Sequence, residues 1–236
     1  YNKHSRAASQ LAVGGVIEGL DNIQTGKWRN AFAIVRPPGH HSGARNTING
    51  FCVYNNVAIG IQYLRTKYNI NRIAVFDWDV HHGDGTQHLF KEDPNLLFIS
   101  LHRHDRGSFD PGDSGAHTNV GNGPAEGKQI NFVEHHELED QSYDLTPGDN
   151  EYIYIFERAL HPILKEFKPE FIFISAGFDS ARGDPLGGMS VGPEGYHYLT
   201  KKLMKIAPLI VVLEGGYNLK SISWAAESVM AALVDE

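Results

Sequence analysis

Hydrophobic residues gather in six short runs along the chain, separated by longer segments of mixed polarity. The runs span residues 31–35, 72–76, 96–101, 129–133, 171–175 and 209–213. Most of them are apolar at successive positions instead of alternate ones, which is the pattern of strands covered on both faces. We therefore predict six strands of a sheet that is buried on both sides.

The segments between these runs carry a helical repeat of apolar positions. They predict helices over residues 4–20, 53–67, 147–167, 193–206 and 219–234. In the third helix Thr146 is a candidate N-cap, Pro147 suits the first helical position, and Pro169 lies just beyond the end. The alternation of strands and helices predicts an α/β fold, with a mostly parallel sheet and helices on both of its faces.

Domain organisation follows from what the sequence lacks. No internal repeat, low-complexity tract or linker divides it, so we expect a single domain over residues 1–236. The chain opens directly on a helix with no strand before it, and we therefore expect a fragment of a larger domain.

Polar residues follow five of the six predicted strands at the point where each strand ends. The segments after these strands read RPPGHH, DWDVHHGDG, HRHDRG, AGFDS and EGGYN. Open parallel sheets place their ligand sites beyond the carboxyl ends of the strands. We expect these five segments to meet at one pocket, and we expect the glycine-rich segment 102–128 to form its rim.

Composition narrows the choice of partners. Acidic residues outnumber basic ones by 28 to 21, the formal charge is −7, and no basic cluster stands out, which argues against nucleic acid as a direct ligand. Cys52 is the only cysteine, so no internal disulfide can form. The sequence shows no signal peptide and no apolar run of membrane-spanning length. We expect an intracellular protein with no membrane partner.

The segment DWDVHHGDG has the residue types of a metal site. Alternate residues of an extended chain share a face, so Asp77, Asp79 and His81 can point together. Two carboxylates and one imidazole suit zinc or a similar divalent ion, Fe²⁺ included. Asp179, at the end of another strand, is the best candidate for the remaining ligand. Spacing alone does not choose between Asp77 and Asp79.

His40 and His41 follow a Pro-Pro-Gly turn close to this predicted metal site. Each ring can donate a hydrogen bond to a carboxylate, and Asp77 and Asp84 are the acids available for that pairing. Such a pair fixes the tautomer and raises the basicity of the ring, as a general base near neutral pH requires. We predict two catalytic histidine–aspartate pairs.

Tyr217 follows two glycines at the end of the last strand, which let the backbone approach a ligand closely. A protonated phenol at this place can donate a hydrogen bond to a developing oxyanion. A turn with a packing tyrosine is the competing interpretation of this motif.

Five motifs together resemble the metal-dependent histone deacetylase family, nearest to its class II members. They are RPPGHH, GFCVYNNVA, DWDVHHGDGTQ, SAGFDSARGDPLGG and EGGYNL, and they run in family order over nearly the whole chain. The resemblance implies the arginase/deacetylase fold and hydrolysis of N-acetyl-lysine in a histone or another protein, in the nucleus or the cytoplasm. Corepressor proteins are candidate partners. It also implies that parts of the domain lie before the first residue and beyond the last.

The resemblance assigns roles to the polar residues. It implies one zinc ion held by Asp79, His81 and Asp179, with His41 as the general base and Tyr217 as the group that polarises the acetyl carbonyl. The family's narrow lysine tunnel would have further residues of this chain around it. They are Phe51 and Phe109 as walls, the Gly50 carbonyl as acceptor for the substrate amide, and Leu186 at the rim.

A structural potassium ion behind the zinc is also implied by the resemblance. Its ligands would be Asp77, the backbone oxygens of Asp79, His81 and Leu101, and the Ser100 hydroxyl.

Two other interpretations of the chain stay open. One is an enzyme of the same fold with another substrate, such as an acetylpolyamine amidohydrolase or an arginase-like ureohydrolase. Leu186 favours acetyl-lysine, because the polyamine-specific relatives have an acidic residue there. The second is a non-catalytic acetyl-lysine-binding scaffold, which would have no need of the complete set of catalytic groups.

Overall fold

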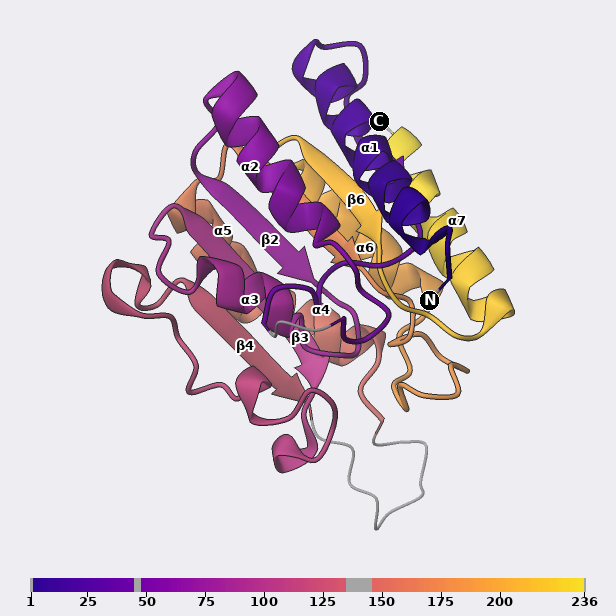
Figure 1. Ribbon diagram of the computed structural model, residues 1–236. Helices are drawn as coiled ribbons and strands as arrows, with labels where there is room; N and C mark the ends of the chain where they lie inside the picture. Colours follow the sequence, from indigo (N-terminus) through magenta and orange to yellow (C-terminus); the bar gives the residue numbers. More distant parts are fainter. Residues whose placement is uncertain (1, 45–47, 135–145, 236) are drawn as a thin grey trace.

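The computed structural model describes residues 2–44, 48–134 and 146–235. Its centre is a six-stranded sheet in which every pair of neighbouring strands is parallel, in the order β1-β6-β5-β2-β3-β4 (Figure 1). The strands are β1 (Ala31–Ala33), β2 (Ile73–Asp77), β3 (Leu96–Arg103), β4 (Gln129–Glu134), β5 (Phe171–Ala176) and β6 (Leu209–Leu213). The prediction of an α/β fold with a parallel sheet is confirmed.

Helices cover both faces of the sheet, as Figure 1 shows. One face is covered by α1 (Ser5–Gln24), α2 (Asn56–Tyr68) and α3 (Asp84–Phe90). The opposite face is covered by α4 (Asp149–Ile155), the π-helical turn η5 (Phe156–Leu160), α5 (His161–Phe167), α6 (Pro193–Met204) and α7 (Leu219–Val234). Among the described residues, no helix is long and apolar enough to span a membrane.

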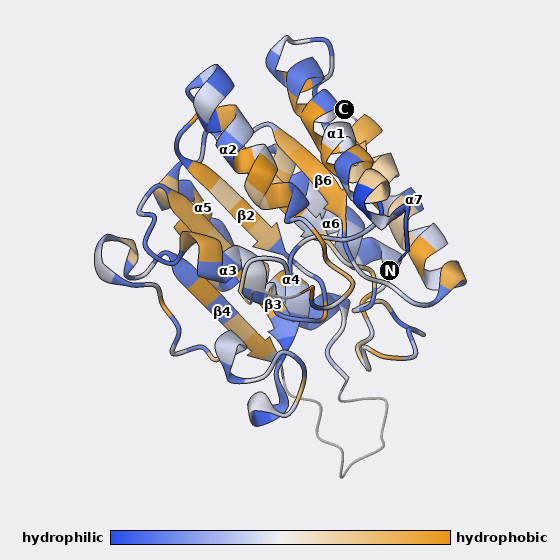
Figure 2. Cartoon of the chain, viewed as in Figure 1, coloured by the Kyte–Doolittle hydropathy of each residue, from blue (hydrophilic) through white to orange (hydrophobic). Residues whose placement is uncertain are grey.

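The two-sided cover explains the continuous apolar runs of the sequence. In β2 the side chains of Ile73 and Val75 enter the core under α1 and α2, whereas Ala74 and Phe76 enter the core on the opposite face. All four are fully buried. Since successive residues of a strand point to opposite faces, both kinds of position must be apolar. Figure 2 shows the strands as strongly hydrophobic and the helices around them as mixed.

The predicted helix at 147–167 begins two residues later than expected. Residues around Pro147 are held in extended form, because the Pro147 carbonyl accepts a hydrogen bond from the Ser190 amide at 2.9 Å. The helix starts at Asp149, and the carboxylate of Glu151 accepts the Gly148 amide at 2.8 Å. Thr146 is therefore not the N-cap, since contact with a distant segment outweighs the local preference for Pro at the first helical position.

Two further differences concern the end of β1 and the short helix α3. β1 ends at Ala33 instead of residue 35, and Ile34 beyond it is 67% exposed. The short helix α3 was not predicted, because seven residues carry too little periodicity to identify a helix. Its first residue is Asp84, so this helix is what holds one of the predicted catalytic carboxylates.

The segment between β3 and β4 folds into three short 3₁₀ turns instead of forming an unstructured connection. They are η1 (Asp105–Gly107), η2 (Asp113–Gly115) and η3 (Gly123–Ala125). The buried imidazole of His102 donates through Nε2 to the Gly115 carbonyl at 2.9 Å, which ties the segment to the end of β3. A side chain at Gly115 would collide with that ring, which explains the glycine there.

Candidate active site

Three side chains with metal-binding atoms converge beyond the carboxyl ends of β2 and β5. They are Asp79, His81 and Asp179, and one ligand atom of each lies within 4.8 Å of the others. Nδ1 of His81 lies 3.1 Å from Oδ1 of Asp79 and 3.1 Å from Oδ2 of Asp179. Strand β2 ends at Asp77, so Asp79 and His81 lie in the loop beyond it. The choice between Asp77 and Asp79 that spacing left open falls on Asp79.

Backbone groups and glycines hold the two carboxylates in place. The Gly215 amide donates to Oδ2 of Asp79 at 2.9 Å, and the Val80 amide donates to Oδ1 of Asp179 at 2.8 Å. A Cβ at Gly177 would collide with the Asp79 carboxylate, and one at Gly215 would lie 2.7 Å from its Oδ2. The glycines of the AGF and EGG motifs therefore leave the space that these carboxylates occupy.

The charges of this group suit a divalent cation. Asp79 and Asp179 are fully buried, and burial together with the Asp79 charge raises the pKa of Asp179 to about 6. Burial also opposes the charged form of His81, but hydrogen bonds to Asp179 and Asp79 raise its pKa to about 10. A bound divalent ion would take the place of that proton and stabilise both carboxylates. The donor set, two carboxylate oxygens and one imidazole nitrogen, fits zinc.

The two predicted histidine–aspartate pairs are both formed. Nδ1 of His40 lies 3.1 Å from Oδ2 of Asp77, and Nδ1 of His41 lies 2.7 Å from Oδ1 of Asp84. The two rings are adjacent, with centroids 4.1 Å apart, and the centroid of His41 is 6.0 Å from that of His81. The structure thus brings the pairs next to the metal-binding group.

The two histidines differ in their electrostatic surroundings. Burial opposes the charge on His40, but the charges of Asp79 and Asp77 outweigh it and raise its pKa. For His41, burial and the neighbouring His40 charge lower the pKa, and they outweigh the hydrogen bond that its ring donates to Asp84, which raises the pKa. At neutral pH, His40 therefore keeps a proton while His41 is able to accept one.

Tyr217 lies at the rim of the same group of residues, 39% exposed. Its amide donates to Oδ2 of Asp184 at 2.7 Å, and Oδ1 of Asp184 accepts from the Leu186 amide at 2.9 Å. Burial and the Asp179 charge raise the pKa of the Tyr217 phenol above its ordinary value. The hydroxyl is therefore a hydrogen-bond donor at neutral pH.

Aromatic and apolar side chains lie around these polar groups. The ring of Phe109 stacks on His81, with centroids 5.2 Å apart, and the ring of Phe51 lies 6.5 Å from that of Tyr217. Phe51 and Leu186 are 65% and 52% exposed. Gly50 takes a positive φ of 51°, and a side chain there would collide with the His41 ring. All the predicted tunnel residues thus lie in segments that contribute to this site.

The predicted potassium ligands are less fully defined by the contacts. Asp77 and Ser100 are paired residues on the neighbouring strands β2 and β3, and both are fully buried. Because Nε2 of His102 donates to a carbonyl, its Nδ1 accepts from the Ser100 hydroxyl at 2.8 Å. The lone pairs of Ser100 stay available for a hard cation, together with the Asp77 carboxylate. Leu101 is the next residue of the strand.

Comparison with known protein families identifies the family of this chain. A family model described as the histone deacetylase domain matches residues 1–233. The chain belongs to the histone deacetylase family. The resemblance predicted from the five motifs is confirmed.

Individual members of the histone deacetylase family match most of the chain. It is 45% identical to human histone deacetylase 9 over 235 residues, which are 98% of this chain and 23% of that protein. It is 44% identical to histone deacetylase HDA1 of Candida albicans, over 100% of this chain and 28% of that protein. The chain thus spans about a quarter of the length of these relatives.

Solved structures agree on the fold. The crystal structure of the HDA15 HD domain superimposes with a TM-score of 0.90 at 42% identity, over 98% of this chain and 63% of that one. The arginase/deacetylase-like architecture that the motifs implied is therefore confirmed at the level of fold.

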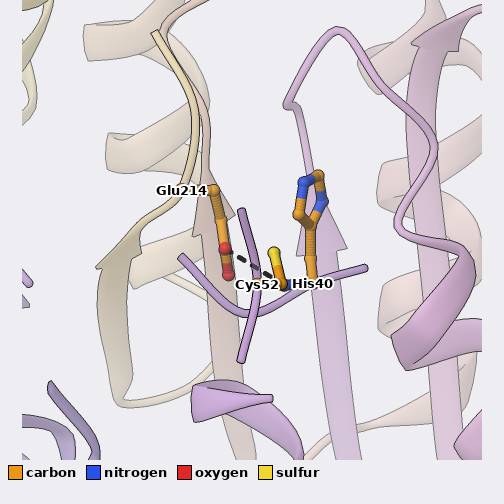
Figure 3. Close-up of side chains that lie close together, drawn as sticks. All are labelled: His40, Cys52 and Glu214. Atoms are coloured by element: carbon orange, nitrogen blue, oxygen red, sulfur yellow. Dashed lines mark hydrogen bonds between the residues drawn. The ribbon is translucent and has the colours of Figure 1, made fainter. Parts of the chain in front are cut away.

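Glu214 is a functional candidate that the sequence analysis overlooked. It is 5% exposed, and its Oε2 accepts the amides of Gly39 at 2.7 Å and His40 at 3.1 Å (Figure 3). This carboxylate therefore connects the end of β6 to the loop that carries both histidines. The sequence did contain a signal for it, because Glu214 is a charged residue directly after the apolar run 209–213.

Cys52 lies close to Glu214 and to His40. Its side chain is fully buried, and burial raises the pKa of the thiol to about 12. A thiol in this state is not a nucleophile at neutral pH.

Proposed function

We propose that this chain is the catalytic part of a protein lysine deacetylase that hydrolyses N-acetyl-lysine with one divalent metal ion, zinc or Fe²⁺. The observation that carries the proposal is the meeting of Asp79, His81 and Asp179 with two histidine–aspartate pairs at one end of the sheet. A purely acetyl-lysine-binding scaffold would have no use for an oriented base beside a set of metal ligands.

The reaction is hydrolysis of an unreactive amide, so it requires an activated water and a polarised carbonyl. Asp79, His81 and Asp179 would hold a metal ion that would polarise the carbonyl as a Lewis acid and lower the pKa of water. His41 accepts the proton of the attacking water at Nε2, because its Nδ1 is bound to Asp84. Asp84 keeps the ring in that tautomer and stabilises the imidazolium that forms.

The remaining groups stabilise the negative charge that develops and protonate the leaving amine. The phenolic hydroxyl of Tyr217 donates a hydrogen bond to the carbonyl oxygen as negative charge develops there. His40 stays protonated beside Asp77 and offsets the negative charge that accumulates near it. The proton collected by His41 passes to the lysine nitrogen when the C–N bond breaks, so that acetate and free lysine leave. No covalent bond to the enzyme forms.

The surroundings of the site favour a lysine side chain that is part of a protein. Phe51 lies next to Tyr217 and Phe109 stacks on His81, and both rings suit the aliphatic part of acetyl-lysine. We assign to the Gly50 carbonyl the role of accepting the substrate amide. Leu186 places no negative charge at the rim. A free polyamine, which is a polycation, would gain nothing from an apolar residue there.

Substrate comparison tests this proposal. Equal concentrations of an acetyl-lysine peptide and an acetylated spermidine would be offered to the zinc-loaded protein, and acetate release would be measured. We expect the peptide to be favoured, and the variant Leu186→Glu to shift the ratio toward the polyamine by about tenfold, as one added favourable charge contact allows. Preference of the unmodified chain for the polyamine would contradict the proposed substrate class.

A further inference from the structure

A second group of metal-type ligands lies beside the candidate metal centre. It consists of His40, Cys52 and Glu214, which come from three separate segments of the chain (Figure 3). One ligand atom of each lies within 4.8 Å of the others, and their exposures are 3%, 0% and 5%. Sulfur, imidazole nitrogen and carboxylate oxygen form a donor set that selects borderline and soft ions such as zinc and cadmium over magnesium or calcium.

Glu214 offers this group an oxygen that the protein itself does not use. The backbone amides of Gly39 and His40 both donate their hydrogen bonds to Oε2 of this carboxylate. Oε1 is buried and has no hydrogen-bond partner among the described residues. A buried carboxylate oxygen without a partner loses its hydration and receives nothing in return. In Figure 3 the carboxylate lies next to the Cys52 side chain, so a cation bound there would satisfy it.

His40 also has one ring atom left for binding. Its Nδ1 is bound to Asp77, while its Nε2 lies 3.7 Å from Oδ2 of Asp79 and makes no shorter contact with any carboxylate of the described residues. Three buried carboxyl groups lie close to His40, those of Asp77, Asp79 and Glu214. An additional cation would reduce their mutual repulsion.

We propose that His40, Cys52 and Glu214 form a second site for thiophilic divalent cations, Zn²⁺ in excess or Cd²⁺, and that its occupation inhibits the enzyme. Binding displaces two protons, one from the Cys52 thiol and one from Nε2 of His40, and both leave to solvent. It thereby withdraws the His40 charge from the surroundings of the reacting groups. The inhibitory effect rests on the proposed function, whereas cation binding does not.

Cys52 makes the proposal directly measurable, because it is the only cysteine of the chain. Thiolate-to-cadmium charge-transfer absorbance in the ultraviolet therefore reports this site alone. Titration of the zinc-loaded protein with Cd²⁺ should give absorbance that saturates at one added equivalent, with turnover lost in parallel. The variant Asp179→Asn, which damages only the first metal centre, should retain the absorbance.

Substitution of Cys52 separates this site from general effects of metals. Cys52→Ala should abolish the absorbance, weaken inhibition by Cd²⁺ at least about 10-fold, and leave turnover without Cd²⁺ unchanged. If that variant fails to fold, Cys52→Ser keeps the size of the side chain and is read in the same way. Glu214→Gln, which keeps an acceptor for the two amides but loses the charge, should weaken Cd²⁺ binding.

Two results would overturn the proposal: no thiolate absorbance in the presence of excess Cd²⁺, or full inhibition by Cd²⁺ in the Cys52 variant. Saturable absorbance in a protein without any turnover would support the site and count against the proposed function, so the two failures are distinguishable.

Discussion

Adjacent histidines in this site have opposite electrostatic surroundings, although both are buried and both are paired with an aspartate. The difference comes from the second carboxylate near His40, since Asp79 lies 3.7 Å from its Nε2. For His41, Asp84 is the only carboxylate of the described residues within 4.0 Å of a ring nitrogen, and burial and the charge of His40 outweigh the effect of Asp84 and Asp79. One ring is thereby kept as a cation and the other as a base, which suits the proposed hydrolysis with His41 as the single base.

The pH dependence of activity follows from His41. Burial and the charge of His40 lower its pKa below the ordinary value of 6.5, so it is neutral and active above that pKa and is protonated and inactive below it. We expect the acidic limb of kcat/KM to have its midpoint below pH 6.5, and activity to be lost as the pH falls through it. A pH–rate profile with an acidic midpoint well above 6.5 would show that another group is the base.

Tyr217 should contribute to the transition state and little to binding. The variant Tyr217→Phe removes one donor from the developing oxyanion and should lower kcat by about 10²–10³-fold, while KM changes little. Steady-state kinetics with an acetyl-lysine peptide, together with the zinc content of both proteins, would measure this. An unchanged kcat would leave Tyr217 with only the packing role that its sequence motif also allowed.

At the level of elements, the site depends on how closely the loops after β2, β5 and β6 approach one another. Gly177 and Gly215 follow β5 and β6, and each leaves room for the carboxylate of Asp79. Neither glycine has a positive φ, so the requirement at these positions is space and not backbone conformation. The glycines are therefore part of the candidate metal site although they provide no ligand.

A glycine-to-alanine comparison tests this requirement for space. Gly177→Ala puts a methyl group against the Asp79 carboxylate and should lower zinc affinity by about 10–100-fold, the range found when groups that support metal ligands are altered. Gly14→Ala in α1 is the matched control, because a Cβ there meets nothing within 4 Å. It should leave zinc binding unchanged and stabilise the helix by about 1 kcal/mol. Equal zinc affinity in both variants would contradict the account.

The sequence located the strands and the residues that meet at their ends better than it predicted the boundaries of elements. Apolar runs located the six strands of the sheet, and the polar clusters after the strands contain the residues that converge at the candidate metal site, because both signals are local in sequence. The start of α4 at Asp149 and the existence of α3 depend on contacts with distant residues or on too few residues. Glu214 was overlooked for the same reason: its partners, Gly39 and His40, lie 175 and 174 residues away.

At the level of the whole molecule, the metal should contribute to stability as well as to catalysis. Asp79 and Asp179 reach the site from β2 and β5, and without a cation their two buried carboxylates repel each other. A ligand that binds only the folded state at a hundredfold excess over Kd stabilises it by about 2.7 kcal/mol. In a chain of this length that corresponds to a rise in Tm on the order of 5–10 °C.

Removal of the metal should therefore lower the melting temperature. Zinc-free protein prepared with a chelator should unfold at a lower temperature than the loaded protein, and zinc should restore the difference. Asp179→Asn provides the control, because its melting temperature should respond little to zinc. Identical unfolding curves for loaded and zinc-free protein would mean that no metal bridges these two strands.

In the proposed function, a metal held by Asp79, His81 and Asp179 beside His41 makes this chain a deacetylase. The most direct measurement is acetate release from an acetyl-lysine peptide by a sample of known metal content, with and without a hydroxamate chelator. We predict about one zinc per chain at this centre and turnover that the hydroxamate abolishes. Turnover that persists after the metal is removed, or a chain with one bound zinc that releases no acetate, would contradict the account.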